Sequence, residues 1–135
     1  MDKILVVDRV TKEYPGRVAV SDISFQVNQG SIHGFLGPNG AGKSTTMKMI
    51  AGMIPSSHGE IQLFGQKVSP DNIELRNQLG LLPENAPLYL DMKVEDYIQY
   101  VAKLHKVKKA KEQTDRVMEE LSLTEVKGRL IGNLS

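Results

Sequence analysis

One nine-residue stretch constrains the fold of this chain more than any other: Gly37 to Thr45, which reads Gly-Pro-Asn-Gly-Ala-Gly-Lys-Ser-Thr. Its three glycines, at 37, 40 and 42, allow backbone angles and close approaches that a Cβ would block. Successive peptide N–H groups can then turn inward and form a nest for phosphate oxygens. The spacing Gly37-x-x-x-x-Gly42-Lys43-Ser44 is the Walker A pattern. An accidental match is expected on the order of once in a few hundred such chains, so the stretch predicts a phosphate-binding loop.

The residue types of this phosphate loop (37–45) suit a nucleotide with a magnesium ion. Lys43 sets a compact positive charge against the outer phosphates, and the Ser44 hydroxyl can ligate Mg²⁺. A helix that begins near Lys43 would point the positive end of its dipole at the same anion. The predicted nucleotide-contacting residues of the loop are Gly37, Pro38, Asn39, Gly40, Ala41, Gly42, Lys43, Ser44 and Thr45.

A phosphate loop of this kind lies between a strand and a helix. The apolar run 32–36 leads directly into the loop and predicts a short strand. After the loop, Met47 and Ile50 give a predicted helix its apolar side, and Gly52 is well placed as the left-handed residue that ends it. The chain therefore has the context that the motif requires.

The other elements are predicted from apolar periodicity. Residues 3–11 predict a strand, with Ile4, Val6 and Val10 on one face and Leu5 and Val7 on the other. Residues 23–27 alternate in the manner of a half-buried antiparallel strand, and 61–63 and 79–82 predict two further short strands. Helical spacing follows, in Val94, Tyr97, Ile98, Val101 and Leu104 and again in Ala110, Val117, Met118 and Leu121. The first half is thus mainly β and the second mainly helical.

Composition excludes several function classes. The 135 residues suffice for one domain, and a formal net charge of +1 gives no overall attraction for nucleic acid. Without cysteine there are no disulfides or thiolate metal sites. No apolar stretch approaches the roughly 20 residues that span a bilayer, so a membrane would matter through a partner. Five lysines between 103 and 111 could suit nucleic acid or lipid headgroups, but the glutamates at 112, 119 and 120 favour a solvated helix junction.

Several segments together resemble the nucleotide-binding domain of ATP-binding cassette (ABC) transporters. The segments that carry the resemblance are 12–14 with 20–25, the loop region 34–46, 59–65, 80–84 and the final four residues 132–135, which resemble the start of the signature motif. The resemblance implies an α/β fold: a P-loop NTPase core with an N-terminal antiparallel β subdomain and a C-terminal helical subdomain. Residues 1–135 would form the N-terminal part of one ATP-binding domain, with a β-rich part over about 1–82 and the helical part over about 83–135.

The resemblance also implies roles for single residues. Tyr14 would stack on the adenine of ATP, and Lys43 would serve catalysis. Glu84 stands where the family has its Q-loop glutamine, and would join Ser44 as a second ligand of Mg²⁺. The segment 82–89 is similar to an export-type subgroup that also carries glutamate at this position.

The family's Walker B strand, catalytic glutamate and switch histidine would all lie beyond Ser135. In the family, the Walker B strand lies between two others: the strand that leads into the phosphate loop and the strand that leads into the Q-loop. The resemblance therefore implies a gap in the central sheet. We expect a fragment of a longer ATPase that binds Mg·ATP weakly and does not hydrolyse it.

The full-length protein would lie in the cytoplasm at the inner face of the cell membrane. Its expected partners are a transmembrane transporter subunit and a second ATP-binding subunit in a head-to-tail dimer, with no nucleic acid. Three alternatives stay open: an ABC ATPase without a membrane subunit, a small-molecule kinase that shares only the loop, and a non-hydrolysing interaction module. The kinase would need an arginine over the phosphates, and none lies between Arg76 and Arg116.

Overall fold

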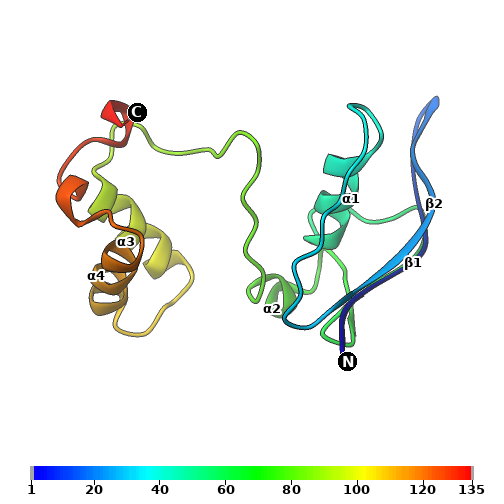
Figure 1. Cartoon of the computed structure of the whole chain (residues 1–135), viewed down its shortest axis with the longest axis horizontal. Coiled ribbons are helices and arrows are strands. Elements are labelled where there is room, and N and C mark those ends of the chain that lie inside the picture. Colours follow the sequence, from blue (N-terminus) through cyan, green and yellow to red (C-terminus); the bar gives the residue numbers. More distant parts are fainter. Residues whose placement is uncertain (1, 135) are drawn as a thin grey trace. The chain divides into compact units, whose positions relative to one another are not determined.

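An antiparallel sheet organises the first part of the computed structural model, which describes residues 2–134. Its strand order is β2-β1-β3-β4, and Figure 1 labels the pair β1 and β2. The strands span β1 (Lys3–Tyr14), β2 (Arg17–Asn28), β3 (His58–Leu63) and β4 (Gln66–Lys67). Two helices belong to the same unit, α1 (Lys43–Ile50) and α2 (Ile73–Arg76). The expected antiparallel β subdomain is confirmed.

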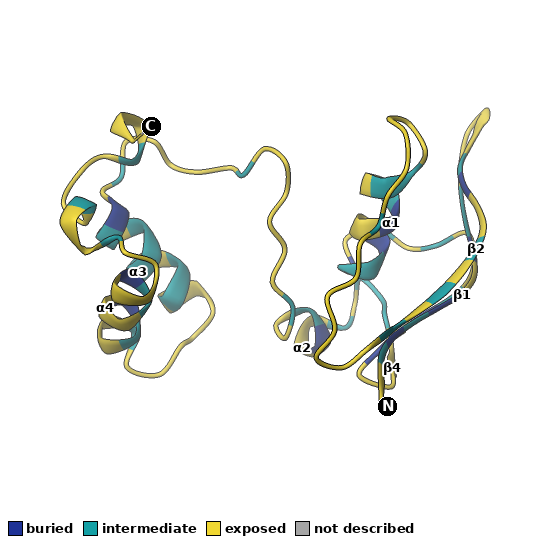
Figure 2. Cartoon of the chain, viewed as in Figure 1, coloured by how far each residue is buried: buried dark blue, intermediate teal, exposed yellow. Residues whose placement is uncertain are grey.

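The core of this unit lies between the sheet and α1. Buried residues of the sheet and α1, with one residue of α2, form a single cluster: Leu5, Val7, Val10, Val20, Met49, Ile61, Leu63 and Leu75. Figure 2 colours the ribbon dark blue where residues are buried. Helix α1 turns Met49 inward and leaves Met47 exposed, although the apolar pattern placed Met47 on the inner side. The helix ends as predicted, because Gly52 adopts a φ of 65° and its N–H donates to the Met49 carbonyl at 3.0 Å.

A bulge in β1 corrects the predicted strand face. Arg9 has a φ of 47°, and the pairing with β2 shifts register between Val7 and Val10. The Arg9 N–H leaves the ladder and donates to the Ser24 hydroxyl at 2.8 Å. The extra residue returns Val10 to the face of Val7 and Leu5, where it is fully buried. A strict two-residue period places Val10 on the opposite face, and that prediction is wrong.

The strand predicted just before the phosphate loop is not formed among residues 2–134. The rings of His33 and Phe35 pack on Phe25 of β2, at 5.7 and 5.3 Å between centroids. The alternate side chains, Ile32 and Leu36, are 103% and 93% exposed. The predicted strand at 79–82 is absent in the same way. A strand requires a hydrogen-bonding neighbour, and none of the described residues pairs with either run.

Two helices form the second unit, which begins at Leu82. They are α3 (Val94–Leu104) and α4 (Ala110–Glu120), which pack against each other and bury Val94, Thr114 and Met118. Two short 3₁₀ turns follow, Thr124–Val126 and Ile131–Asn133. The helical part is therefore confirmed, whereas the assignment of 1–82 and 83–135 to one ATP-binding domain stays a prediction. Ser135, the last residue of the expected signature segment, lies outside the described residues.

The junction between α3 and α4 uses lysine where helix geometry favours glycine. Lys106 has a φ of 53°, and the next N–H, that of Val107, donates back to the Ala102 carbonyl at 2.9 Å. This is the bonding pattern of a Schellman cap, whose left-handed residue is most often glycine.

Replacing this lysine by glycine should stabilise the second unit. We expect Lys106→Gly to raise the free energy of unfolding by roughly 0.5–1 kcal/mol, because glycine adopts positive φ without strain. The matched control, Lys103→Gly inside the last turn of α3, should lower it by a similar amount. Urea unfolding followed by tyrosine fluorescence measures both, since Tyr89, Tyr97 and Tyr100 all lie in this unit. Destabilisation by both substitutions would contradict the assignment.

Candidate functional site

The end of the phosphate loop is held tightly against β2. Gly42 has a φ of 93°, and a Cβ built on it would lie 2.4 Å from the Ala19 carbonyl oxygen and 2.9 Å from Val20 Cγ2. Gly40 has a φ of 81°, but a Cβ there would meet nothing within 4 Å. Gly42 therefore fixes where the loop ends, and Gly40 shapes a part of it that is open to solvent. Sequence reasoning could not have found Ala19 and Val20, because the contact joins positions more than 20 residues apart.

Helix α1 begins immediately after this glycine. Gly42 occupies the N-cap position, and no side chain caps the helix. The N–H groups of a first helical turn have no partners within the helix. The Thr46 N–H and hydroxyl both donate to the Gly42 carbonyl at 2.9 Å and tie the loop to the helix. The free N–H groups at 43–45 and the helix dipole together favour a bound anion.

Lys43 folds its side chain back over the loop. Its Nζ donates to the carbonyl oxygens of Gly37 and Pro38, the second at 2.8 Å. The ammonium group therefore lies over residues 37 and 38, at the start of the phosphate loop. These two carbonyls partly replace the negative charge that an anion would bring.

The other predicted residues of the loop stay accessible. Pro38, Asn39, Ala41 and Ser44 are exposed, and Thr45 is half-buried. The Ser44 hydroxyl lies in the first turn of α1, beside the free N–H groups. Across residues 2–134, no three His, Asp or Glu side chains gather into a metal site. Within the described residues, Ser44 therefore has no such cluster beside it.

Tyr14 lies at the same end of the sheet as the loop. It pairs with Arg17 at the tip of the β1–β2 hairpin, and Ala19, against which Gly42 packs, follows two residues later on β2. Strand geometry places Arg17 and Ala19 about 7 Å apart along β2. Lys12 Nζ lies 5.2 Å from the centre of the tyrosine ring, and 41% of the residue is exposed. The fold thus places Tyr14 on the hairpin whose second strand contacts the end of the phosphate loop, with 41% of the residue exposed.

Glu84 belongs to the second unit, where it is exposed in an irregular stretch between Leu82 and the start of α3. Its predicted role as a metal ligand together with Ser44 stays a prediction.

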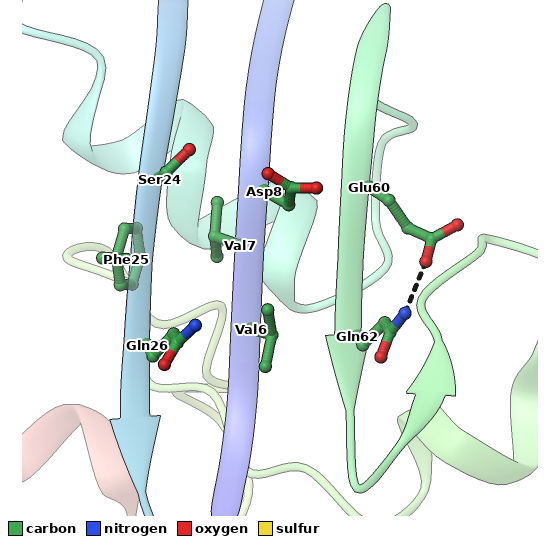
Figure 3. Close-up of a pocket in the computed structure, with 8 residues that line it drawn as sticks. All are labelled: Val6, Val7, Asp8, Ser24, Phe25, Gln26, Glu60 and Gln62. Carbon is green, nitrogen blue, oxygen red and sulfur yellow. Dashed lines mark hydrogen bonds between the residues drawn. The ribbon is translucent and has the colours of Figure 1, made fainter.

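A separate hollow of about 510 Å³ opens on the sheet and involves none of the predicted residues. Figure 3 shows its lining from β1, β2 and β3, including Asp8 and Glu60. A hydrogen bond from the Gln62 amide, at 2.6 Å, and then one from Lys67 hold the pKa of Glu60 below its usual value. Two carboxylates repel phosphate, so this hollow is a poor candidate for a nucleotide.

Comparison with known proteins assigns the family. Residues 20–135 match the family model described as ABC transporter. The chain belongs to the ABC transporter family. Its predicted resemblance to this family's ATP-binding domain is confirmed, and its sequence covers only part of such proteins.

Similar proteins include ATP-binding proteins of several transport systems. The lipopolysaccharide export system ATP-binding protein LptB of Escherichia coli (strain K12) is 34% identical over 136 residues, which cover 97% of this chain and 56% of LptB. The uncharacterized ABC transporter ATP-binding protein YhcH of Bacillus subtilis (strain 168) is 35% identical over 125 residues, covering 93% of this chain and 41% of YhcH. The chain thus spans about half the length of these relatives.

Solved structures agree on the fold. An ATP-binding subunit of an ABC transporter superposes with a TM-score of 0.83 at 25% identity, covering 98% of this chain and 56% of that one. The cbiO1 protein of Clostridium perfringens, part of the ABC transporter complex cbiONQ, gives 0.85 at 23% identity, covering 100% of this chain and 57% of its own. The fold is that of an ABC ATPase domain, represented in part. Among the described residues, no helix is long and apolar enough to cross a membrane.

Proposed function

We propose that this chain is the nucleotide-binding part of an ABC transporter subunit and that it binds Mg·ATP through Tyr14 and the phosphate loop. The observation that carries the proposal is the pairing of Lys43 with an uncapped first turn of α1. On binding, the Lys43 ammonium would exchange the carbonyls of Gly37 and Pro38 for phosphate oxygens. Both partners of each bond would then be ionised, which adds the attraction between two opposite charges to the hydrogen bond.

The donor set fits a magnesium nucleotide. The free N–H groups and the ammonium group can donate hydrogen bonds to phosphate oxygens. The hydroxyl supplies an oxygen, the ligand atom that Mg²⁺ prefers. Mg²⁺, when bound, neutralises phosphate charge. Ser44 would supply the protein's oxygen ligand, and Glu84 a second one directly or through water. Tyr14 would offer its ring to the adenine, which an aromatic face recognises without demanding hydrogen bonds.

Binding would serve transport through a transmembrane partner at the cytoplasmic face of the membrane. Glu84 in place of glutamine supports membership in the export-type subgroup. LptB, named for an export system, and BcrA of Bacillus licheniformis, a bacitracin transport protein, are relatives in keeping with it. Hydrolysis would require catalytic residues that this sequence does not contain and a second ATP-binding subunit facing the first. We propose that the 135 residues alone bind nucleotide without turning it over.

The magnesium dependence of binding tests the role of Ser44. We expect Mg²⁺ to strengthen ATP binding, and Ser44→Ala to remove roughly tenfold of that gain because a neutral oxygen ligand is lost. Calorimetric titration with ATP, once in the presence of magnesium and once in the presence of EDTA, measures the effect of Mg²⁺ on the affinity of the wild type and of Ser44→Ala. Ser21→Ala, at an exposed position on β2, is the matched control. If Mg²⁺ strengthens ATP binding equally in Ser44→Ala and in the control, Ser44 is not the proposed magnesium ligand. ATP hydrolysis by this chain that depends on Lys43 would refute the proposal that the 135 residues bind nucleotide without hydrolysing it.

A further inference from the structure

The junction of α3 and α4 carries a concentration of positive charge that the proposed nucleotide site does not use. Five lysines fall within residues 103–111, here called the basic junction: Lys103, Lys106, Lys108, Lys109 and Lys111. All five are exposed, and Figure 2 shows the connection between the two helices exposed along its length. The nine residues contain five of the chain's 17 basic residues and none of its 16 acidic ones.

Helix energetics do not explain these lysines. Lys106 occupies a left-handed position that favours glycine, as does Lys109, with a φ of 54°. Lys109 is also the N-cap of α4 and makes no capping hydrogen bond. Serine, threonine, aspartate and asparagine are preferred there, and positive charge opposes the helix dipole at that end. Positions that break local folding rules are often ones that serve function.

Neighbouring carboxylates neutralise little of this charge. Lys109 pairs with Glu112 at 3.2 Å, but both side chains are mostly exposed, so the pair is weak. Glu119 and Glu120 lie in the last turn of α4, and Glu120 pairs there with Arg116. At 1.5 Å per residue they are about 15 Å from the start of the helix, beyond the screening length of roughly 10 Å at 0.1 M salt. The glutamates at 112, 119 and 120, which in the sequence favoured a solvated junction, therefore do not cancel the positive charge of the five lysines.

Two apolar side chains project from the same segment. Leu104 is 61% exposed and Val107 is 39% exposed, and each has a lysine beside it in sequence. Lysines around apolar tips suit the boundary between lipid headgroups and acyl chains, where the cations meet phosphates and the apolar groups leave water. Nucleic-acid surfaces more often use arginine and aromatic stacking, and residues 101–115 contain no arginine, phenylalanine, tyrosine or tryptophan.

The charge of the remaining residues points to a local contact. Outside the basic junction, 12 basic residues face 16 acidic ones. An anionic surface would therefore attract the chain at the junction and repel it elsewhere. We propose that the basic junction is a contact site for an anionic lipid surface, with the lysines on the headgroup phosphates and Leu104 and Val107 at the acyl boundary. The proposal does not depend on nucleotide binding.

Vesicle co-sedimentation tests the proposal with the intact 135-residue chain. Vesicles of equal parts phosphatidylglycerol and phosphatidylcholine should bind it, vesicles of phosphatidylcholine alone should not, and binding should weaken as salt increases. Each lysine near such a surface contributes about fivefold in affinity, so Lys103→Gln with Lys108→Gln should weaken binding by about 25-fold. Leu104→Ser with Val107→Ser should reduce the binding that persists at high salt.

The matched control removes two charges elsewhere in the same unit. Lys93 and Lys127 are exposed and lie outside the basic junction, so Lys93→Gln with Lys127→Gln should change binding by less than about threefold. All substituted positions are exposed, and circular dichroism checks that each variant folds. Equal losses in the two double variants, or equal binding to both kinds of vesicle, would overturn the proposal. Binding to a DNA oligonucleotide through the same lysines, without binding to vesicles, would also overturn the proposal and show that the junction contacts nucleic acid.

Discussion

Lys43→Ala is expected to weaken Mg·ATP binding about 10- to 100-fold, the largest loss of affinity for any single side chain of the chain. The reason is the position of Nζ, which already lies over the phosphate loop on the carbonyls of Gly37 and Pro38. A hydrogen bond to a charged group contributes roughly 1.5–3 kcal/mol, which corresponds to that range of affinity. Fluorescence titration with a labelled ATP analogue measures the change.

A second lysine of the same helix provides the control. Lys48 is exposed in the last turn of α1, so Lys48→Ala removes the same charge from the same helix, away from the loop. It should alter affinity by less than about threefold. The thermal midpoint of Lys43→Ala should stay close to that of the wild type, because its two hydrogen bonds are exposed. If the two variants bind nucleotide equally well, the chain does not use the loop to bind nucleotide.

Gly42→Ala is expected to have the largest effect on stability. A Cβ at this position would lie 2.4 Å from the Ala19 carbonyl oxygen, and the φ of 93° is strained for any other residue. The end of the loop or the edge of β2 would have to move. We expect a loss of about 2–4 kcal/mol in the free energy of unfolding, together with loss of nucleotide binding. Urea unfolding monitored by far-UV circular dichroism measures the first.

Gly40→Ala distinguishes the conformational cost of a positive φ from the steric clash that Gly42→Ala would add. Gly40 has a similar φ of 81°, but its Cβ would enter open space, so only the conformational cost of about 1 kcal/mol applies. The difference between the two variants reports the contact with Ala19. If Gly40→Ala proves as destabilising as Gly42→Ala, the packing of the loop on β2 is not what holds it.

Local pattern predicted the elements whose energetics are local. The helical period of Val94 to Leu104 matches α3, and alternation over 23–27 matches part of β2. The loop between a β-rich segment and α1 followed from glycine spacing and a lysine. These features depend on residues within one or two turns of each other, so a single sequence contains the information.

The misassigned features depend on distant residues. The inward turn of Val10 follows from a bulge at Arg9 whose N–H bonds to Ser24, 15 positions away. The apolar runs 32–36 and 79–82 look like buried strands, yet they lack a neighbour among the described residues and form none. The contact between Gly42 and Ala19 belongs to the same class. Glu84 stays a prediction because its role depends on a metal and on the phosphate loop of the other unit.

The central claim is that the phosphate loop of residues 37–45 binds the phosphates of Mg·ATP. Amide chemical-shift mapping by NMR tests it most directly, because each residue reports separately. Addition of Mg·ATP should shift the resonances of Gly40 to Thr46 and of Tyr14, and Lys43→Ala should suppress those shifts. Shifts confined to the basic junction, or a loop whose resonances do not move at saturating nucleotide, would contradict it.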